Sequence, residues 1–289
     1  MQSMKKIIAA VLAAAMMVPF AACSGGSTAA SSEAASSAAA SSAASSGSSD
    51  GIVVPDNIKS SGKIVMSTNA EFPPFESKDN NKIVGIDVDI ANVVAEKLGA
   101  QLSINDVDFN SLVMELKSGK CDFVAAGMSI TDDKKENVDF SDPYFDATQS
   151  IIVLKGSPVK SRTDLNGKKV GVQEGTTGDT YCTNEKGKND IKVKETVRYN
   201  KGADAVTDLI NGRLDAVVID DFPAQKFVAM HSDKLQKLSD ALTVEHYAIA
   251  VKKGNAQLLN DINLVLKELK SSGKLDEIIN TYKSSLENG

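Results

Sequence analysis

From residue 51 onward, short apolar runs alternate with stretches whose apolar residues recur every three or four positions. Such alternation of strand and helix patterns is typical of an α/β fold. The run Lys63–Thr68 predicts a strand, and the Pro73-Pro74 pair interrupts the pattern because proline cannot continue a central strand. Residues 123–126 predict a second buried strand.

Two amphipathic helices are predicted between these strands. Asp87 is the expected N-cap of the first helix, which stops at Gly99. Asn110 or Ser111 is expected to cap the second helix, which ends at Gly119. The apolar positions of each helix fall on one face, so each helix should pack against a sheet.

A nine-residue unit occurs twice, as LKSGKCDFV at residues 116–124 and as LINGRLDAV at residues 209–217. In each copy a helix ends on glycine, a cation follows near the negative helix end, and an aspartate leads into an apolar strand. The two copies start 93 residues apart and predict two lobes of similar design. Coincidence is the alternative, because a basic residue after a helix-terminal glycine is common.

Two apolar segments, residues 149–155 and 243–252, lie between the parts that we assign to different lobes. They predict two crossings of the chain and therefore a two-stranded hinge. The expected first lobe consists of residues 51–149 and 247–289, and the expected second lobe consists of residues 150–246. The fold predicted from the pattern is thus a two-lobed α/β fold.

The first 23 residues predict a secretory signal peptide. Lysines at positions 5 and 6 precede an apolar run over residues 7–20, which is too short to span a bilayer comfortably. Residues 20–23 read Phe-Ala-Ala-Cys and resemble a bacterial lipobox, after which Cys23 would be diacylated and become the new N-terminus. The alternative is an ordinary signal peptide with a chance cysteine.

Residues 24–50 consist almost entirely of Ser, Ala and Gly, and their charged side chains are Glu33 and Asp50. Such a segment buries too little apolar surface to offset its ordering entropy, so it predicts a flexible tether. Two acyl chains anchor a protein stably, since each buried CH₂ contributes about 0.8 kcal/mol. A long tether after the cysteine suits an extracytoplasmic, lipid-anchored domain on the outer face of a Gram-positive plasma membrane.

The formal net charge of the whole chain is −6, and removal of residues 1–23 takes away two lysines and no acid, which gives −8. An acidic chain argues against a nucleic-acid partner and gives no support for a basic membrane-binding face. Cys121 and Cys182 fall in different halves of the folded part, and we expect two separate thiols, with a disulfide between them as the alternative.

Seven segments occur in an order and spacing that resemble a known family. Together they look like the type 2 periplasmic-binding-protein fold and, more narrowly, the solute-binding proteins of polar amino acid ABC transporters, from about residue 60 to residue 283. The segments are PPF (73–75), GIDVDIA (85–91), LKSGKCD (116–122), SIT (129–131), VDFSDPYF (138–145), DLNGKKVGVQEGTT (164–177) and GRLDAVVIDD (212–221).

The resemblance implies that an L-amino acid is held between two closing lobes and is then handed to a membrane permease. It also implies a monomer, and no cofactor is expected. An amino acid zwitterion needs a cation and N–H donors for its carboxylate, a carboxylate for its ammonium group, and a fitted wall for its side chain.

The segment after Ser129 predicts the carboxylate half of such a site. Thr131 is the expected N-cap of a helix, whose free N–H groups and positive dipole end attract an anion. Lys134 falls in its first turn, where the family usually has an arginine that grips a carboxylate through two parallel N–H bonds. A lysine supplies only a point charge. The alternative interpretation of residues 132–136 is a solvated charge run.

Residues 171–178 predict the matching part of the second lobe, where Thr176 and Thr177 offer N–H groups and hydroxyls after Gly175. A plain strand–helix turn is the alternative. Asp220 ends a predicted strand, and the carboxyl end of a strand in such a sheet faces the ligand crevice. By resemblance Asp220 takes the ammonium group, whereas an exposed loop acid is the alternative.

The expected side-chain wall contains Asn69, Glu71, Phe72 and Phe109, although each phenylalanine is equally suited to a core. Asn69 favours a neutral polar ligand, whereas Glu71 favours arginine or lysine, and the sequence leaves this conflict open. Four further ligand contacts are expected. They are Gly127, Met128, Ser129 and Gln149.

Two other functions are alternatives for this sequence. A cyclohexadienyl-dehydratase-like enzyme shares this fold, and a solute-sensing lipoprotein is the third possibility. His231 and His246 are not part of a nucleophile pattern, and the sequence has neither an HExxH motif nor a metal-ligand cluster. The sequence therefore favours a binding protein over an enzyme.

Overall fold

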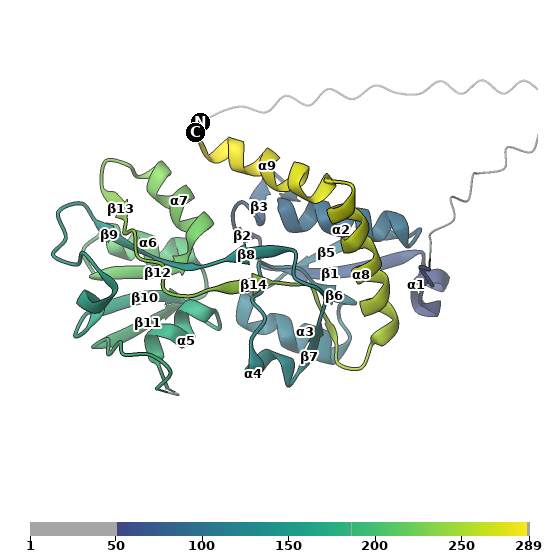
Figure 1. Cartoon of the computed structure of the whole chain (residues 1–289), viewed down its shortest axis with the longest axis horizontal. Helices are drawn as coiled ribbons and strands as arrows, with labels where there is room; N and C mark the ends of the chain where they lie inside the picture. The colour runs from purple at the N-terminus through teal and green to yellow at the C-terminus, as the bar shows by residue number, and fades with distance from the viewer. Residues whose placement is uncertain (1–50, 186, 288–289) are drawn as a thin grey trace, which may run out of the picture. The chain divides into compact units, whose positions relative to one another are not determined.

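The structure, a computed structural model, describes residues 51–185 and 187–287. The predicted signal peptide, Cys23 and the predicted tether at residues 24–50 lie outside the described residues. Within the described part, two five-stranded sheets carry helices and are joined by a pair of short strands (Figure 1). The predicted two-lobed α/β fold is confirmed.

The first sheet has the strand order β5-β1-β6-β15-β7. Strand β1 pairs in parallel with β5 and β6, and β15 runs antiparallel between β6 and β7. The bounds are β1 (Lys63–Thr68), β5 (Gln101–Asp106), β6 (Phe123–Val124), β7 (Val138–Phe140) and β15 (Ala250–Lys252).

The second sheet repeats this topology with the order β11-β10-β12-β9-β13. Strand β10 pairs in parallel with β11 and β12, and β9 runs antiparallel between β12 and β13. The bounds are β9 (Gln149–Leu154), β10 (Lys169–Gln173), β11 (Glu195–Tyr199), β12 (Ala216–Asp220) and β13 (Leu235–Lys237).

The repeated sequence unit has the same structural role in both lobes. Its strands become β6 and β12, the central strands of the two sheets. Oδ2 of Asp122 accepts a 2.8 Å hydrogen bond from the backbone N of Val65, and Oδ2 of Asp215 accepts one of the same length from Lys169. Each aspartate therefore ties the start of the central strand to its parallel neighbour.

Helices pack on both sheets. The first sheet carries α2 (Ile86–Lys97) and α3 (Leu112–Ser118), and α8 (Ala256–Ser271) and α9 (Lys274–Glu287) pack on α2. The second sheet carries α5 (Thr177–Thr183), α6 (Gly202–Ile210) and α7 (Asp221–Met230). The other elements are α1 (Asp56–Ser61), α4 (Asp132–Lys135), two 3₁₀ turns at Phe109–Ser111 and Arg162–Leu165, and a small sheet of β2 (Glu71–Phe72), β3 (Glu76–Asp79) and β4 (Lys82–Val84).

The predicted N-cap role of Asp87 is wrong. Helix α2 begins at Ile86, and Gly85 is its N-cap. The buried Oδ2 of Asp87 instead accepts hydrogen bonds from the backbone N of Gly127 at 2.7 Å and from the Tyr144 hydroxyl at 2.8 Å. Burial raises the pKa of this carboxyl to about 6. Asp87 thus fixes the loop that follows β6.

The crossing between the sheets is made by β8 (Phe145–Ala147) and β14 (Glu245–Tyr247), which pair antiparallel (Figure 1). This differs from the prediction that residues 149–155 cross between the lobes. Gln149–Leu154 lies inside the second sheet as β9, where all its side chains except the last are buried. The predicted segment 243–252 does cross, and it contains both β14 and β15. The lobe boundaries drawn from the sequence stay a prediction.

Aromatic rings pack around the crossing strands. The Phe75 ring meets Tyr247 and Phe145 edge-on, each at a centroid distance of 5.0 Å, and Phe145 meets Phe222 of α7 at 5.3 Å. Edge-to-face pairs of this kind add about 0.5–1.5 kcal/mol each beyond their buried area. This cluster therefore links the hinge to both lobes.

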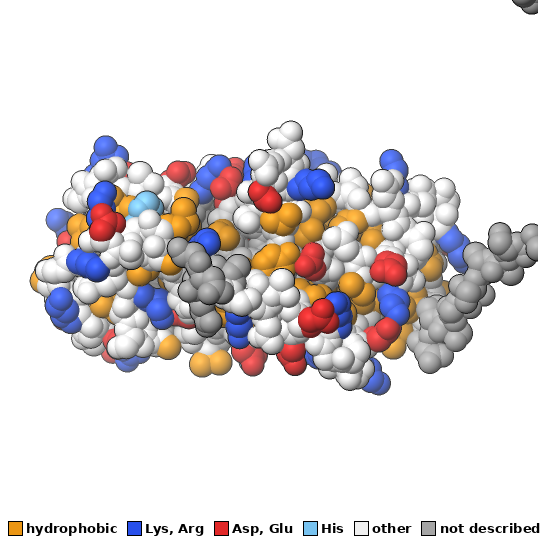
Figure 2. All heavy atoms as spheres, turned by 90° about the horizontal axis from the view of Figure 1, so that it is seen from above, with side chains coloured by type: hydrophobic (Ala, Val, Ile, Leu, Met, Phe, Trp, Pro, Cys, Tyr) orange, Lys and Arg blue, Asp and Glu red, His pale blue; other side chains and the backbone are white. Residues whose placement is uncertain are grey.

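The surface mixes charges of both signs. Acidic and basic side chains are interspersed over the face shown in Figure 2.

Cys121 and Cys182 are both buried and free, and burial raises the pKa of the Cys182 thiol to about 12. None of the helices in residues 51–185 and 187–287 is long and apolar enough to cross a membrane.

Candidate functional site

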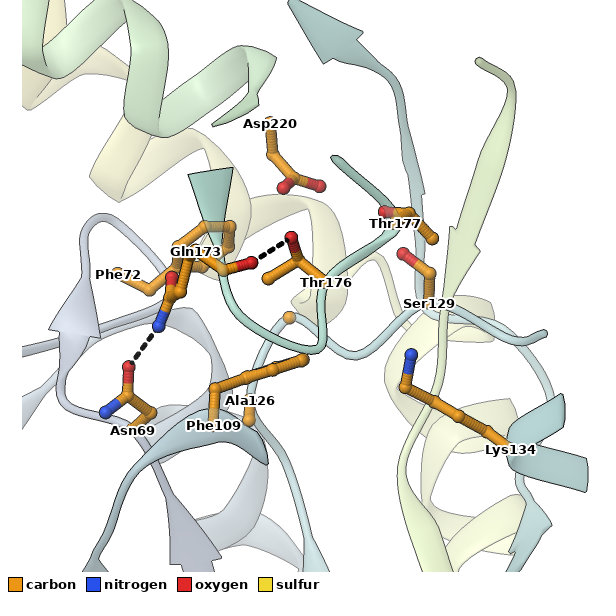
Figure 3. A pocket seen from close by; sticks show the side chains of 11 residues that line it. Asn69, Phe72, Phe109, Ala126, Ser129, Lys134, Gln173, Thr176, Thr177 and Asp220 are labelled. Atoms are coloured by element: carbon orange, nitrogen blue, oxygen red, sulfur yellow. Dashed lines mark hydrogen bonds between the residues drawn. The ribbon is translucent and has the colours of Figure 1, made fainter. Parts of the chain in front are cut away.

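A small cavity of about 10 Å³ lies where the two sheets face each other, which is close to the space that one water molecule needs. An amino acid can occupy this place only if the lobes or the lining side chains move. Figure 3 shows the polar side chains that converge on it. The lining residues are Asn69, Phe72, Phe109, Ala126, Gly127, Ser129, Lys134, Gln173, Thr176, Thr177 and Asp220.

A direct hydrogen bond joins the lobes in this cavity. Nε2 of Gln173 donates to Oδ1 of Asn69 at 2.9 Å (Figure 3). Gln173 is the last residue of β10, and Asn69 follows β1 directly, so both lie at the carboxyl ends of parallel strands. In open α/β sheets, ligands bind in the crevice outside such strand ends.

Asp220 lies at the end of β12, as the sequence predicted, and it is 5% exposed. The Tyr247 hydroxyl donates a hydrogen bond to its Oδ1. Burial, and next the negative charge of Glu245, raise the pKa of Asp220 to about 7, although the hydrogen bond from Tyr247 opposes this shift. A cation placed beside this carboxyl would favour its charged form.

Lys134 enters the cavity from the first lobe, on α4 (Figure 3). Its Nζ lies 3.4 Å from the carbonyl oxygen of Gly175 in the second lobe and 5.9 Å from the centroid of the Phe109 ring. Burial lowers the pKa of Lys134, whereas the charges of Glu245 and Asp220 act in the opposite direction.

Thr131 is the N-cap of α4, as predicted, and its side chain accepts a hydrogen bond from the backbone N of Lys134. The helix has four residues, so it is a single turn. A single turn sums few peptide dipoles, so the predicted dipole attraction for an anion is small here. The Lys134 ammonium group and nearby hydroxyls are the stronger candidates for anion contacts.

Those hydroxyls belong to Ser129 and Thr177, and both donate to the same carboxylate oxygen in the structure. The acceptor is Oε2 of Glu245 on β14, with a distance of 2.6 Å from the Thr177 hydroxyl. Sequence reasoning missed Glu245. The available signal was its position in a predicted crossing segment, since a hinge strand passes both half-sites.

Three of the predicted contacts do not line the cavity. Glu71 is ion-paired with Lys201 at 2.7 Å, Met128 is fully buried, and Gln149 is fully buried with its Nε2 bonded to the Thr177 hydroxyl at 3.0 Å. Gln149 therefore supports the lining residue Thr177 from behind, and Met128 belongs to a buried hydrophobic cluster.

Two lining residues, Ala126 and Gln173, were not predicted. The argument that places Asp220 at the ligand crevice also applies to Gln173, because both residues end parallel strands of the second sheet.

The site shows no arrangement suited to metal binding. Within residues 51–185 and 187–287, no group of three or more His, Cys, Asp or Glu side chains is placed to hold a metal ion. The chemistry available to the cavity is therefore that of a lysine, a buried carboxyl, hydroxyls, amides and two aromatic rings.

Comparisons with known proteins point to one family. The sequence pattern of the bacterial extracellular solute-binding proteins, family 3, matches residues 64–285. The arginine-binding extracellular protein ArtP of Bacillus subtilis (strain 168) is 36% identical over 221 residues, which cover 75% of this chain and 84% of that protein. A probable histidine-binding protein of Neisseria gonorrhoeae is 37% identical over 227 residues, which cover 76% and 83% respectively.

One solved structure is similar to this chain in both fold and sequence. The arginine-bound form of a truncated ArgBP from T. maritima superposes with a TM-score of 0.69 at 46% sequence identity, and the match covers 74% of this chain and 100% of that chain. The relatives and this structure carry names of amino acid-binding proteins.

Proposed function

Because this chain belongs to the bacterial extracellular solute-binding proteins of family 3, we propose that it captures a polar L-amino acid for an ABC importer. The observation that carries the proposal is the placement of Asp220 and Lys134 in one cavity between the lobes. One is a buried carboxyl and the other a cation, and the ionised carboxyl together with the lysine complements the two charges of a zwitterion. The relatives named for arginine and histidine favour a cationic side chain.

Each end of the ligand has partners of suitable chemistry. The ligand ammonium group pairs with the Asp220 carboxylate. The ligand carboxylate takes the Lys134 ammonium group and the hydroxyls of Ser129 and Thr177. Phe72 and Phe109 flank the aliphatic part of the ligand side chain, and Asn69 offers a polar contact.

Binding is coupled to lobe closure. Lys134 and Ser129 come from the first lobe, whereas Thr177 and Asp220 come from the second. Contacts from both lobes to one ligand exist only in the closed form, so the ligand shifts the equilibrium toward closure by their energy. Charge-assisted hydrogen bonds contribute about 1.5–3 kcal/mol each, so two of them are enough to make the closed form dominant.

The cellular setting follows from the N-terminal sequence pattern. Diacylation of Cys23 anchors the protein to the outer face of the plasma membrane, and residues 24–50 let the folded domain reach its permease.

The protein acts as a monomer that binds and delivers, and not as an enzyme. Incubation with prephenate or arogenate tests the dehydratase alternative, and product formation would contradict the binding-protein assignment.

The main experiment combines a ligand screen with calorimetry. A thermal-shift screen over the twenty amino acids, cystine and ornithine should find at least one that stabilises the protein. Isothermal calorimetry with that ligand should then give at least about tenfold weaker binding for Asp220→Ala and for Lys134→Ala, since each removes a charge-assisted bond.

Lys135→Ala is the control for Lys134→Ala, because Lys135 is the neighbouring, exposed lysine on α4. It should bind within about twofold of wild type. Near-native affinity in both site variants would contradict the site assignment, and no stabilisation by any amino acid would contradict the proposed function itself.

A further inference from the structure

The carboxylate of Glu245 holds the hydroxyl groups that the proposed function assigns to the ligand carboxylate. Its Oε2 accepts hydrogen bonds from the hydroxyls of Ser129 and Thr177, which belong to different lobes. Its Oε1 accepts a third hydrogen bond from the Thr243 hydroxyl. Glu245 is 7% exposed, so this carboxylate is inside the protein rather than at its rim.

A ligand carboxylate and the Glu245 carboxylate cannot share these donors. Each hydroxyl has one proton to donate, so two acceptors compete for it. Two carboxylates at one place also repel each other, and burial strengthens that repulsion because the surrounding dielectric is low. The ligand carboxylate must therefore displace Glu245 or bind without the two hydroxyls.

The structure provides a place into which Glu245 can move. Glu245 lines a groove of about 700 Å³ that adjoins the cavity, and Lys134 and Thr177 line both spaces. The groove also has the polar side chains of Asn137, Arg162 and Asn189 in its lining. Because Glu245 itself lines this groove, its side chain can rotate into open space rather than into packed side chains.

We propose that Glu245 is a specificity-determining residue, which competes with the ligand α-carboxylate for the hydroxyls of Ser129 and Thr177. This inference rests on the proposed function. An amine that lacks a carboxylate leaves Glu245 in place and avoids the competition. The preference for an amino acid over its decarboxylated amine is therefore weaker in wild-type protein than in a variant that lacks the Glu245 carboxylate.

Matched ligand pairs test this directly. L-arginine and agmatine differ by one carboxylate, and so do L-histidine and histamine. Calorimetry should compare wild type with Glu245→Gln, which removes the charge, and with Glu245→Ala, which removes the competing side chain. The ratio of the amine Kd to the amino acid Kd should rise at least fivefold in Glu245→Ala and by a smaller factor in Glu245→Gln, whose amide oxygen still accepts hydrogen bonds.

The ratio cancels any effect of the lost negative charge on the ligand cation, because both members of a pair carry that cation. Asp146→Asn is the control, since Asp146 is an exposed acid on the partner hinge strand, and its ratio should equal that of wild type. Thermal unfolding of each variant shows that it is folded.

An unchanged or lower ratio in both Glu245 variants, with amino acid binding retained, would overturn this proposal and leave the proposed function intact. Absence of binding for all four ligands in wild-type protein would overturn it together with the assignment of a cationic amino acid ligand.

Discussion

The side-chain amide of Gln173 donates a 2.9 Å hydrogen bond to Oδ1 of Asn69, and this bond connects the two sheets across the candidate site. It exists only when the lobes are closed, so it adds to the stability of the closed form. Gln173 also donates to the backbone oxygen of Asn200 at 3.0 Å, and Asn69 donates to that of Val107 at 2.9 Å. Both amides are thus held in place by their own lobes.

The first prediction concerns this bond. Asn69→Ala and Gln173→Ala should each weaken amino acid binding by about two- to tenfold, because closure loses about 0.5–1.5 kcal/mol. In a double-mutant cycle measured by calorimetry, the coupling energy should lie in the same range. Strictly additive effects would contradict the role of the bond in closure.

A second pair serves as the control for that cycle. Nδ2 of Asn110 donates to Oε2 of Glu174 at 3.0 Å, and this bond also joins the lobes but is exposed to solvent. Water replaces an exposed hydrogen bond at little cost, so the coupling of Asn110→Ala with Glu174→Ala should be below about 0.5 kcal/mol.

The second prediction concerns Glu71, which the sequence suggested as part of the side-chain wall. It pairs with Lys201 across the lobes at 2.7 Å, and the two side chains are 26% and 43% exposed. Exposed pairs contribute about 0–1 kcal/mol, so Glu71→Gln should change ligand affinity by less than about fivefold at physiological salt. A loss as large as that of Asp220→Ala, measured with the same ligand, would show that Glu71 contacts the ligand.

The third prediction is a pH dependence of binding. The pKa of Asp220 is raised to about 7, so the protonated form dominates below that pH in the ligand-free protein. A ligand ammonium group needs the carboxylate, so affinity should weaken about tenfold between pH 8 and pH 6. Calorimetry at both pH values measures this change. Asp220→Asn should bind weakly with a flat profile, and an equally steep profile in that variant would assign the titration to another group.

The same shift has a consequence for stability. The carboxyl of Asp220 has an ordinary pKa of 3.8 in an unfolded chain and about 7 in the fold. Its contribution to stability is therefore fully present below about pH 4 and is lost as the pH rises through 7. Urea denaturation without ligand measures the unfolding free energies of wild type and of Asp220→Asn. From pH 4 to pH 8, wild type should lose stability relative to the asparagine variant.

The fourth prediction concerns Gly127, whose backbone lies in the left-handed region with φ of +50°. A Cβ at this position would lie 2.7 Å from Cε1 of Phe72, which lines the cavity. Gly127→Ala should lower the free energy of unfolding by roughly 2 kcal/mol or more, because backbone strain and a steric clash add. It should also weaken ligand binding by displacing the Phe72 ring.

Gly119→Ala is the matched control. Gly119 has φ of +72°, and a Cβ there would meet nothing within 4 Å. Its cost should be the conformational term alone, about 1 kcal/mol, with ligand affinity unchanged. Equal losses in urea denaturation for both variants would mean that the contact with Phe72 contributes nothing.

The sequence by itself determined the local elements and their repetition. Helix C-caps at glycine, apolar strands and the Gly-x-x-Asp unit are short-range patterns, and they led to two lobes and to Asp220 at a strand end. The same local reasoning placed Thr131 as an N-cap. It misplaced Asp87, because helix N-cap propensity and the needs of a buried hydrogen-bond acceptor favour the same residue type.

Only the tertiary structure decided which distant residues meet. Asn69 and Gln173 are 104 positions apart in the chain, and Ser129 and Glu245 are 116 apart, so no periodicity links them. The hinge strand brings Glu245 to both half-sites, and the ion pair with Lys201 holds Glu71 away from the cavity. These outcomes depend on the relative placement of two sheets, which long-range packing sets and local sequence preference does not.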